Sequence, residues 1–141
     1  MFRRLDDHVL VTGQIEPQDV AEAAAQGVTM IVNNRPDGEA PGQPPAAEIE
    51  AAARAAGLGY RHIPVAGGLS PDLVDAMDEA LAASEGGVLA FCASGTRSTY
   101  LWALSRAKAG DDAEEIVARA AAAGYDLARL RPYLGQVQGS R

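Results

Sequence analysis

The chain has 141 residues, which is the size of one domain and too small for two ordinary hydrophobic cores. It is 48% apolar and 22% charged, as is typical of globular proteins, and its net charge of -7 argues against nucleic acid and anionic membranes as partners. No apolar run is long enough to span a membrane, and the first residues lack the apolar core of a secretion signal, so we expect a cytoplasmic protein.

The sequence offers few ligands for a metal ion. It contains one cysteine and two histidines, which are Cys92, His8 and His62, and their spacing is not that of a metal site. A single cysteine forms no internal disulfide and has no second thiol to resolve a persulfide within the chain. We therefore predict no metal and no cofactor, and an outside acceptor for any group carried on Cys92.

Short apolar runs alternate with helical periodicities along the chain, and Gly, Pro and capping residues mark the boundaries. Predicted strands cover 8–12, 29–33, 60–65 and 88–92, and predicted helices cover 17–26, 46–56, a segment capped by Ser70, the segment from Gly95 to Gly110, a segment capped by Asp112 and a short piece before Pro132. This alternation predicts one α/β domain over residues 1–141, with a parallel sheet between two helical layers.

Three connections follow the carboxyl ends of predicted strands. They are Cys92 with the residues after it, the segment 35–45, and the turn Ala66 to Gly68. Segment 35–45 is rich in Pro and Gly without a period, and its length is typical of a lid or a binding loop. Because ligands gather at the carboxyl ends of parallel strands, we expect the three connections to form one pocket.

The stretch Val88 to Thr99 indicates a strand, a tight loop and the start of a helix. The free backbone N-H groups of a helix start favour a negative charge, so Cys92 at this position is predicted to be a nucleophilic thiolate. Arg97 supplies a planar fork for an oxyanion, and the Ser98 hydroxyl is a candidate donor to the thiolate. The anion-binding loop itself is Ala93, Ser94, Gly95 and Thr96.

A plainer interpretation of the same residues exists. Cys92 is then a small apolar residue that ends a core strand, and Arg97 is an ordinary surface charge. An arginine at the start of a helix opposes the helix dipole, however, so stability alone does not explain Arg97. We therefore favour the functional interpretation.

The loop resembles those of cysteine-dependent phosphatases and rhodanese sulfurtransferases. Together with stretches 11–15, 28–39 and 60–65, it is similar to the phosphatase-like domain of beta-lactamase hydrolase-like proteins, up to about Ala109. That family is also described as a sulfur transferase. The resemblance implies a cysteine-phosphatase-like fold, a three-layer αβα arrangement whose four-stranded parallel sheet has the cysteine strand in its interior.

The sequence departs from the phosphatase pattern at two places. Four residues separate Cys92 from Arg97, where phosphatases have five and rhodaneses have the shorter loop. Phosphatases also carry a general acid about thirty residues before the cysteine, and this chain has Val65-Ala66-Gly67-Gly68 there. A phosphatase needs such an acid to protonate the leaving alkoxide, and sulfur transfer does not.

Several side chains remain candidates around the loop. Asp37, Glu39 and Asp72 are possible general acids, although Asp37 also suits a turn and Asp72 a first helical turn. Arg35 is a candidate anion contact. We interpret His62 as a structural histidine, and Tyr100 and Trp102 as packing residues.

We therefore predict a sulfurtransferase-like enzyme in which Cys92 takes sulfane sulfur from thiosulfate or a persulfide and passes it to a soluble thiol. The partners are then a small anionic substrate and a thiol acceptor. The first alternative is a tyrosine or dual-specificity-like phosphatase that forms a cysteinyl-phosphate. The second is a module that binds a phosphorylated or sulfur-bearing partner without turnover, in which Cys92 is dispensable.

Overall fold

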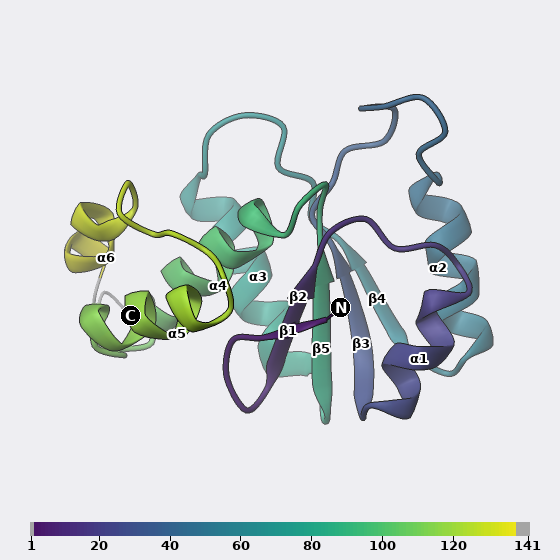
Figure 1. Ribbon diagram of the computed structural model, residues 1–141, viewed down its shortest axis with the longest axis horizontal. Helices are drawn as coiled ribbons and strands as arrows, with labels where there is room; N and C mark the ends of the chain where they lie inside the picture. The colour runs from purple at the N-terminus through teal and green to yellow at the C-terminus, as the bar shows by residue number, and fades with distance from the viewer. Residues whose placement is uncertain (1, 138–141) are drawn as a thin grey trace.

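The computed structural model describes residues 2–137, and it confirms the predicted α/β fold with a sheet between two layers of helices (Figure 1). The strands are β1 (Arg3–Arg4), β2 (Val9–Thr12), β3 (Val28–Asn33), β4 (Gly59–His62) and β5 (Gly87–Phe91). The helices are α1 (Asp19–Ala25), α2 (Ala46–Ala55), α3 (Pro71–Ala83), α4 (Thr96–Lys108), α5 (Ala113–Ala122) and α6 (Arg131–Val137). None of these helices is long and apolar enough to cross a lipid bilayer.

The sheet has the strand order β1-β2-β5-β3-β4. Strands β2, β5, β3 and β4 are parallel, and β5, which leads to Cys92, lies between β2 and β3 as the family resemblance implied. The predicted number of four strands is wrong, because β1 adds a fifth strand antiparallel to β2. Both residues of β1 are exposed arginines, so it lacks the apolar alternation by which strands are identified in a sequence.

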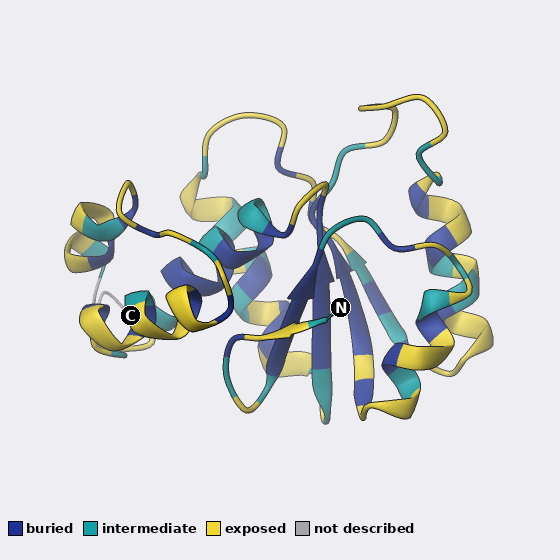
Figure 2. Cartoon of the chain, viewed as in Figure 1, coloured by how far each residue is buried: buried dark blue, intermediate teal, exposed yellow. Residues whose placement is uncertain are grey.

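Each face of the sheet contributes to a separate hydrophobic core. Along β5, Val88 and Ala90 face the core formed with α3 to α6, whereas Leu89 and Phe91 face the core formed with α1 and α2. Helix α4 is buried over most of its length (Figure 2), and its Trp102 is only 1% exposed, with the indole N-H donating to Asp6. The predicted packing role of Trp102 is confirmed. Helices α5 and α6 pack against α4.

Two element boundaries show why sequence signals succeed or fail. Ser70 caps α3 as predicted, because its hydroxyl accepts a hydrogen bond from the Leu73 N-H. Helix α1 begins at Asp19 and not at Pro17, because the residues before it form a tighter turn, in which the Asp19 N-H donates to the Glu16 carbonyl at 2.9 Å.

Candidate active site

The three connections predicted to meet do lie together at the carboxyl edge of the sheet. Cys92 directly follows β5, and Asn34 directly follows β3, the neighbouring strand. The guanidinium of Arg97 donates to the Val65 carbonyl oxygen at 2.8 Å, which brings the end of the third connection to the same place. The parallel strand order therefore gathers these segments at one site.

The loop from Cys92 to Arg97 is short because one glycine turns it into α4. Gly95 has φ 94°, a left-handed conformation that side chains disfavour. A Cβ atom at this position would also collide with the Tyr125 hydroxyl. Helix α4 therefore begins immediately after Gly95, with its free N-H groups at the loop.

The thiol of Cys92 lies inside this ring of N-H groups. Its residue is 1% exposed, and Sγ accepts a hydrogen bond from the Gly95 N-H at 3.1 Å. Burial by itself favours the neutral thiol, but hydrogen bonds from the backbone N-H groups of the loop outweigh it and lower the pKa of Cys92. The donors are those of Ser98, Ser94, Gly95 and Arg97. The surroundings of Cys92 thus favour the thiolate form.

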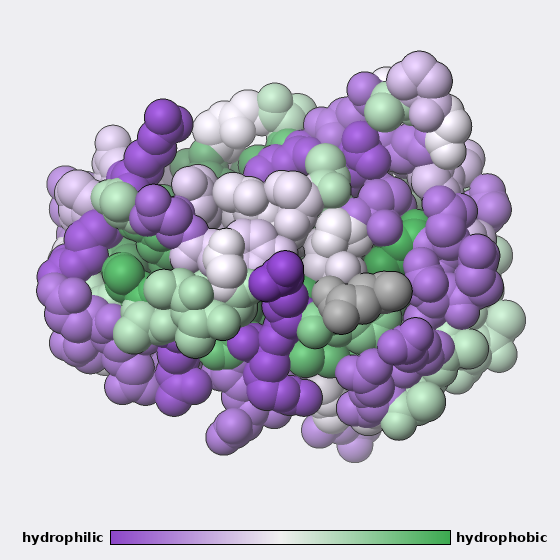
Figure 3. All heavy atoms as spheres, in the orientation of Figure 1, coloured by the Kyte–Doolittle hydropathy of each residue, from purple (hydrophilic) through white to green (hydrophobic). Residues whose placement is uncertain are grey.

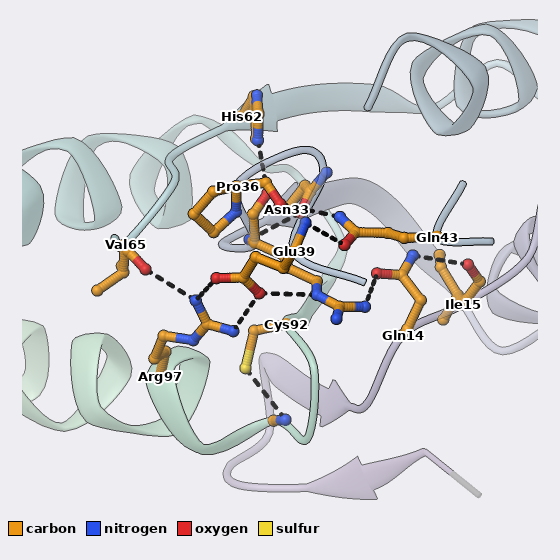
Figure 4. A network of polar contacts seen from close by, with 12 residues as sticks. Gln14, Ile15, Asn33, Pro36, Glu39, Gln43, His62, Val65, Cys92 and Arg97 are labelled. Carbon is orange, nitrogen blue, oxygen red and sulfur yellow. Dashed lines mark hydrogen bonds and ion pairs between the residues drawn. The ribbon is translucent and has the colours of Figure 1, made fainter. Parts of the chain in front are cut away.

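The fork of Arg97 holds a carboxylate. Its two terminal nitrogens donate to the two oxygens of Glu39 at 2.8 and 2.9 Å, and Figure 4 shows this pair beside Cys92. Arg35 donates from Nε to the same carboxylate at 2.8 Å and from Nη1 to Gln14 at 3.2 Å. Two arginines therefore converge on one anionic group next to the thiol, which is the arrangement expected of an anion site.

This contact decides the protonation state of Glu39. Side-chain hydrogen bonds from Arg97 first and from Arg35 second lower the pKa of Glu39 to about 2. The carboxylate is therefore ionised throughout the physiological pH range. A carboxylate held in this way has no proton to give, so Glu39 does not fit the role of a general acid while it is paired with Arg97.

The other two candidate acids lie at positions that have structural explanations. The Asp37 carboxylate accepts from the N-H of Ala46 at 2.7 Å, which places it at the start of α2. Asp72 is exposed in the first turn of α3, where the helix dipole favours a carboxylate. Both positions match the plainer interpretations of these residues.

The prediction for the Ser98 hydroxyl is wrong. It donates to the Asn34 side-chain oxygen at 2.7 Å, and Ser98 is fully buried. The Asn34 amide in turn donates to the Ile63 carbonyl at 3.0 Å, so this bridge joins α4 to the ends of β3 and β4. Ser98 contributes to the thiolate through its backbone N-H and not through its hydroxyl.

The remaining predicted residues surround the loop. The Ser94 and Thr96 hydroxyls lie 3.0 Å apart on the outer side of the turn, where both residues have accessible surface. The His62 ring bonds to the Arg35 carbonyl at 2.9 Å and is exposed, so its structural role lies at the surface. Within residues 2–137 no group of three potential ligands is arranged to hold a metal ion.

Two contacts of the loop have no signal in the sequence. The Tyr125 hydroxyl donates to the Ser94 carbonyl at 3.0 Å, and the Gln14 N-H donates to the Ala93 carbonyl at 3.4 Å. These residues lie 31 positions after and 79 positions before the carbonyls they contact. Sequence spacing alone does not predict such distant contacts.

A cysteine after a central parallel strand, a loop of inward N-H groups and an arginine on the next helix together define a cysteine-phosphatase-like domain. The chain belongs to the family described as the phosphatase-like domain of beta-lactamase hydrolase-like proteins, which matches residues 1–109. The family predicted from the sequence is therefore confirmed.

Comparison with individual proteins supports the same class. A beta-lactamase hydrolase-like protein of Xylella fastidiosa is 38% identical over 132 residues, which are 92% of this chain and 31% of that protein. A structure from Neisseria meningitidis, described as that of a candidate phosphatase, has a TM-score of 0.85 and 35% identity, covering 96% of this chain and 97% of the other. PTPMT1, at 13% identity and a TM-score of 0.71 over 97% and 96% of the two chains, shares the fold. The family description and the Neisseria structure support the phosphatase alternative better than the predicted sulfurtransferase.

Proposed function

We propose that this domain transfers sulfane sulfur through Cys92. The Cys92 thiolate attacks the outer sulfur of thiosulfate, a new S-S bond forms, and sulfite leaves with the electron pair of the broken S-S bond. A soluble thiolate then attacks the terminal sulfur of the persulfide and releases the Cys92 thiolate. Both leaving groups are stable anions, so neither step needs a proton from the protein.

The observation that carries this proposal is the state of the three candidate acids. Glu39 is ionised on the Arg97 fork, and once a substrate displaces it, its ordinary pKa of 4.5 still keeps it ionised at neutral pH. Asp37 holds the start of α2, and Asp72 lies in the first turn of α3. Phosphate ester hydrolysis needs protonation of a poor leaving group, for which a positioned acid contributes about 10²- to 10⁴-fold. The site therefore suits a reaction whose leaving group departs as an anion.

In the proposed reaction the donor replaces the Glu39 carboxylate. Oxygens of thiosulfate bind the Arg97 fork, as the carboxylate oxygens do at 2.8 and 2.9 Å. The N-H groups around Cys92 hold the negative charge of the attacking and departing sulfur. Arg35, which already reaches the same carboxylate, is the auxiliary anion contact.

Hydrolysis of a phosphate monoester through a cysteinyl-phosphate is the second candidate. It is supported by the phosphatase-like family and by the Neisseria structure with its TM-score of 0.85. A substrate with an acidic leaving group, such as an aryl phosphate, lowers the need for a general acid. This candidate therefore predicts activity toward aryl phosphates and little toward alkyl phosphates.

The two candidates are separated by turnover assays on the same preparations. Sulfite release from thiosulfate with glutathione as acceptor is measured beside phosphate release from an aryl phosphate, for the wild type and for Cys92→Ser. The proposal predicts sulfite release that depends on Cys92, with phosphate release no greater than that of the variant. Phosphate release that depends on Cys92 without sulfite release overturns it. If both reactions are absent and sulfate still binds Cys92→Ser, the domain is a binding module.

A further inference from the structure

The peptide between Ser94 and Gly95 makes hydrogen bonds on two sides, through its N-H to the thiol and through its carbonyl to Tyr125. Its N-H donates to Cys92 Sγ at 3.1 Å. In a planar trans peptide the carbonyl points opposite to the N-H, so the Ser94 oxygen faces outward. There it accepts the Tyr125 hydroxyl at 3.0 Å. The outer bond thus fixes the orientation of the inner one.

Tyr125 is packed tightly against this turn. The space that a Cβ atom of Gly95 would fill is taken by the Tyr125 hydroxyl and ring, so the glycine and the tyrosine fit together. Burial raises the pKa of Tyr125, and the charge of Cys92 acts in the same direction. The phenol therefore keeps its proton at neutral pH and remains a donor.

The backbone of Tyr125 is held from two sides. Helix α5 ends in a Schellman motif, in which Gly124 has φ 97° and the Tyr125 N-H donates to the Ala120 carbonyl at 2.8 Å. From β1, the Arg3 side chain donates to the Ala123 carbonyl at 2.9 Å. The hydroxyl therefore approaches the cysteine loop from a fixed turn.

We infer that Tyr125 is a positioning residue for the nucleophile, which acts by holding the Ser94–Gly95 peptide with its N-H toward Cys92. Tyr125 lies beyond residues 1–109, so the family match does not include it. The inference rests on the proposed function only in taking Cys92 as the nucleophile. It holds for sulfur transfer and for phosphate hydrolysis alike.

The electrostatic surroundings of the thiol are otherwise unchanged by removing this hydroxyl. The charged group that acts on Cys92 is Arg97, which is itself paired with Glu39, and the cation that acts on Tyr125 is Arg3. Tyr125→Phe leaves all of these side chains in place. A change in Cys92 reactivity in Tyr125→Phe therefore measures the contribution of the hydroxyl and of its hydrogen bond to the Ser94–Gly95 peptide.

The test measures the rate of Cys92 alkylation by iodoacetamide as a function of pH. Tyr125→Phe should slow alkylation at neutral pH about three- to tenfold, since one net hydrogen bond is lost, and should raise the pKa of the Cys92 thiol. Tyr133→Phe, whose side chain is exposed on α6, is the matched control and should behave as the wild type. Alkylation needs neither a sulfur donor nor a phosphate ester, so failure of the proposed function does not affect this result.

A second measurement reads the peptide directly. The amide proton signal of Gly95 should move in Tyr125→Phe and remain unchanged in Tyr133→Phe. If Tyr125→Phe does not fold, Arg3→Met provides a second test through the Gly95 signal alone, because it removes the bond to Ala123 but also removes a charge near Tyr125. An unchanged pH profile together with an unchanged Gly95 signal in a folded variant overturns the inference.

Discussion

Two loops follow neighbouring strands at the carboxyl edge of the sheet, and they are built differently. The cysteine loop after β5 turns within a few residues into α4 and is held by backbone hydrogen bonds around a buried thiol. The loop over residues 35–45, after β3, is long and mostly exposed, and side chains such as Asp37 and Gln43 hold it. The loops meet where Glu39 binds Arg97.

The two loops therefore carry different parts of the site: one holds the reactive thiol, and the other holds the carboxylate that occupies Arg97. The proposed nucleophile, Cys92, is on the loop held by backbone hydrogen bonds, so displacement of a single N-H should change its reactivity. The anion that now occupies the arginine fork is on the exposed loop, and the Glu39 side chain is 30% exposed. Two arginines hold Glu39, one of them in a bidentate pair, so in the proposed reaction Glu39 competes with the incoming substrate for Arg97. The predictions below test this separation, beginning with the largest expected effect.

Replacement of Arg97 by lysine tests the anion contact at the start of α4. Lysine keeps the charge but loses the planar fork, so we expect kcat/KM for thiosulfate to fall about hundredfold. The matched control is Arg54→Lys, an exposed residue of α2 paired with Glu50, which should retain full activity. Equal activity of Arg97→Lys and the wild type would show that the fork does not bind the donor.

Removal of the buried hydrogen bonds of Asn34 to Ser98 and Ile63 tests what holds α4 to the ends of β3 and β4. Asn34→Ala leaves the Ser98 hydroxyl and the Ile63 carbonyl without their partner, so the free energy of unfolding should fall by about 2 kcal/mol. Urea denaturation measures this change. Gln26→Ala, at the exposed C-terminal end of α1, should alter it by less than about 0.5 kcal/mol. Similar losses of unfolding free energy in the two variants would show that the Asn34 hydrogen bonds do not stabilise the fold.

Neutralising Glu39 tests the exposed loop. Glu39→Gln removes the anion that competes for Arg97, so the KM for thiosulfate should fall at least about fivefold. Glu50→Gln, which breaks an exposed pair on α2, is the control for a change of charge. A higher KM in Glu39→Gln would mean that the carboxylate positions Arg97 and does not compete with the substrate.

The smallest expected effect concerns stability at acid pH. Because the pKa of Glu39 is about 2 in the folded protein and 4.5 is its ordinary value, its ion pairs stabilise the fold fully above pH 4.5. This contribution is lost as the pH falls through about 2. The difference in unfolding free energy between the wild type and Glu39→Gln should therefore shrink over this range. A difference that grows with acidification contradicts the assignment.

The parts of the site that are local in sequence were predictable. The apolar run before Cys92, the glycine turn and the helix after it are set by short-range rules, so the loop and the position of its cysteine follow from the sequence. The partners that reach the loop from afar were not. Tyr125, the pairing of Glu39 with Arg97 and the bond of Ser98 to Asn34 depend on tertiary packing, for which a single sequence has no periodic signal.

The most direct test of the central claim is the intact mass of the protein after incubation with glutathione persulfide or thiosulfate. Our account predicts the gain of one sulfur atom on the wild type and no gain on Cys92→Ser, with no adduct of the mass of a phosphoryl group after incubation with an aryl phosphate. A phosphoryl adduct that depends on Cys92, with no sulfur adduct, would contradict it.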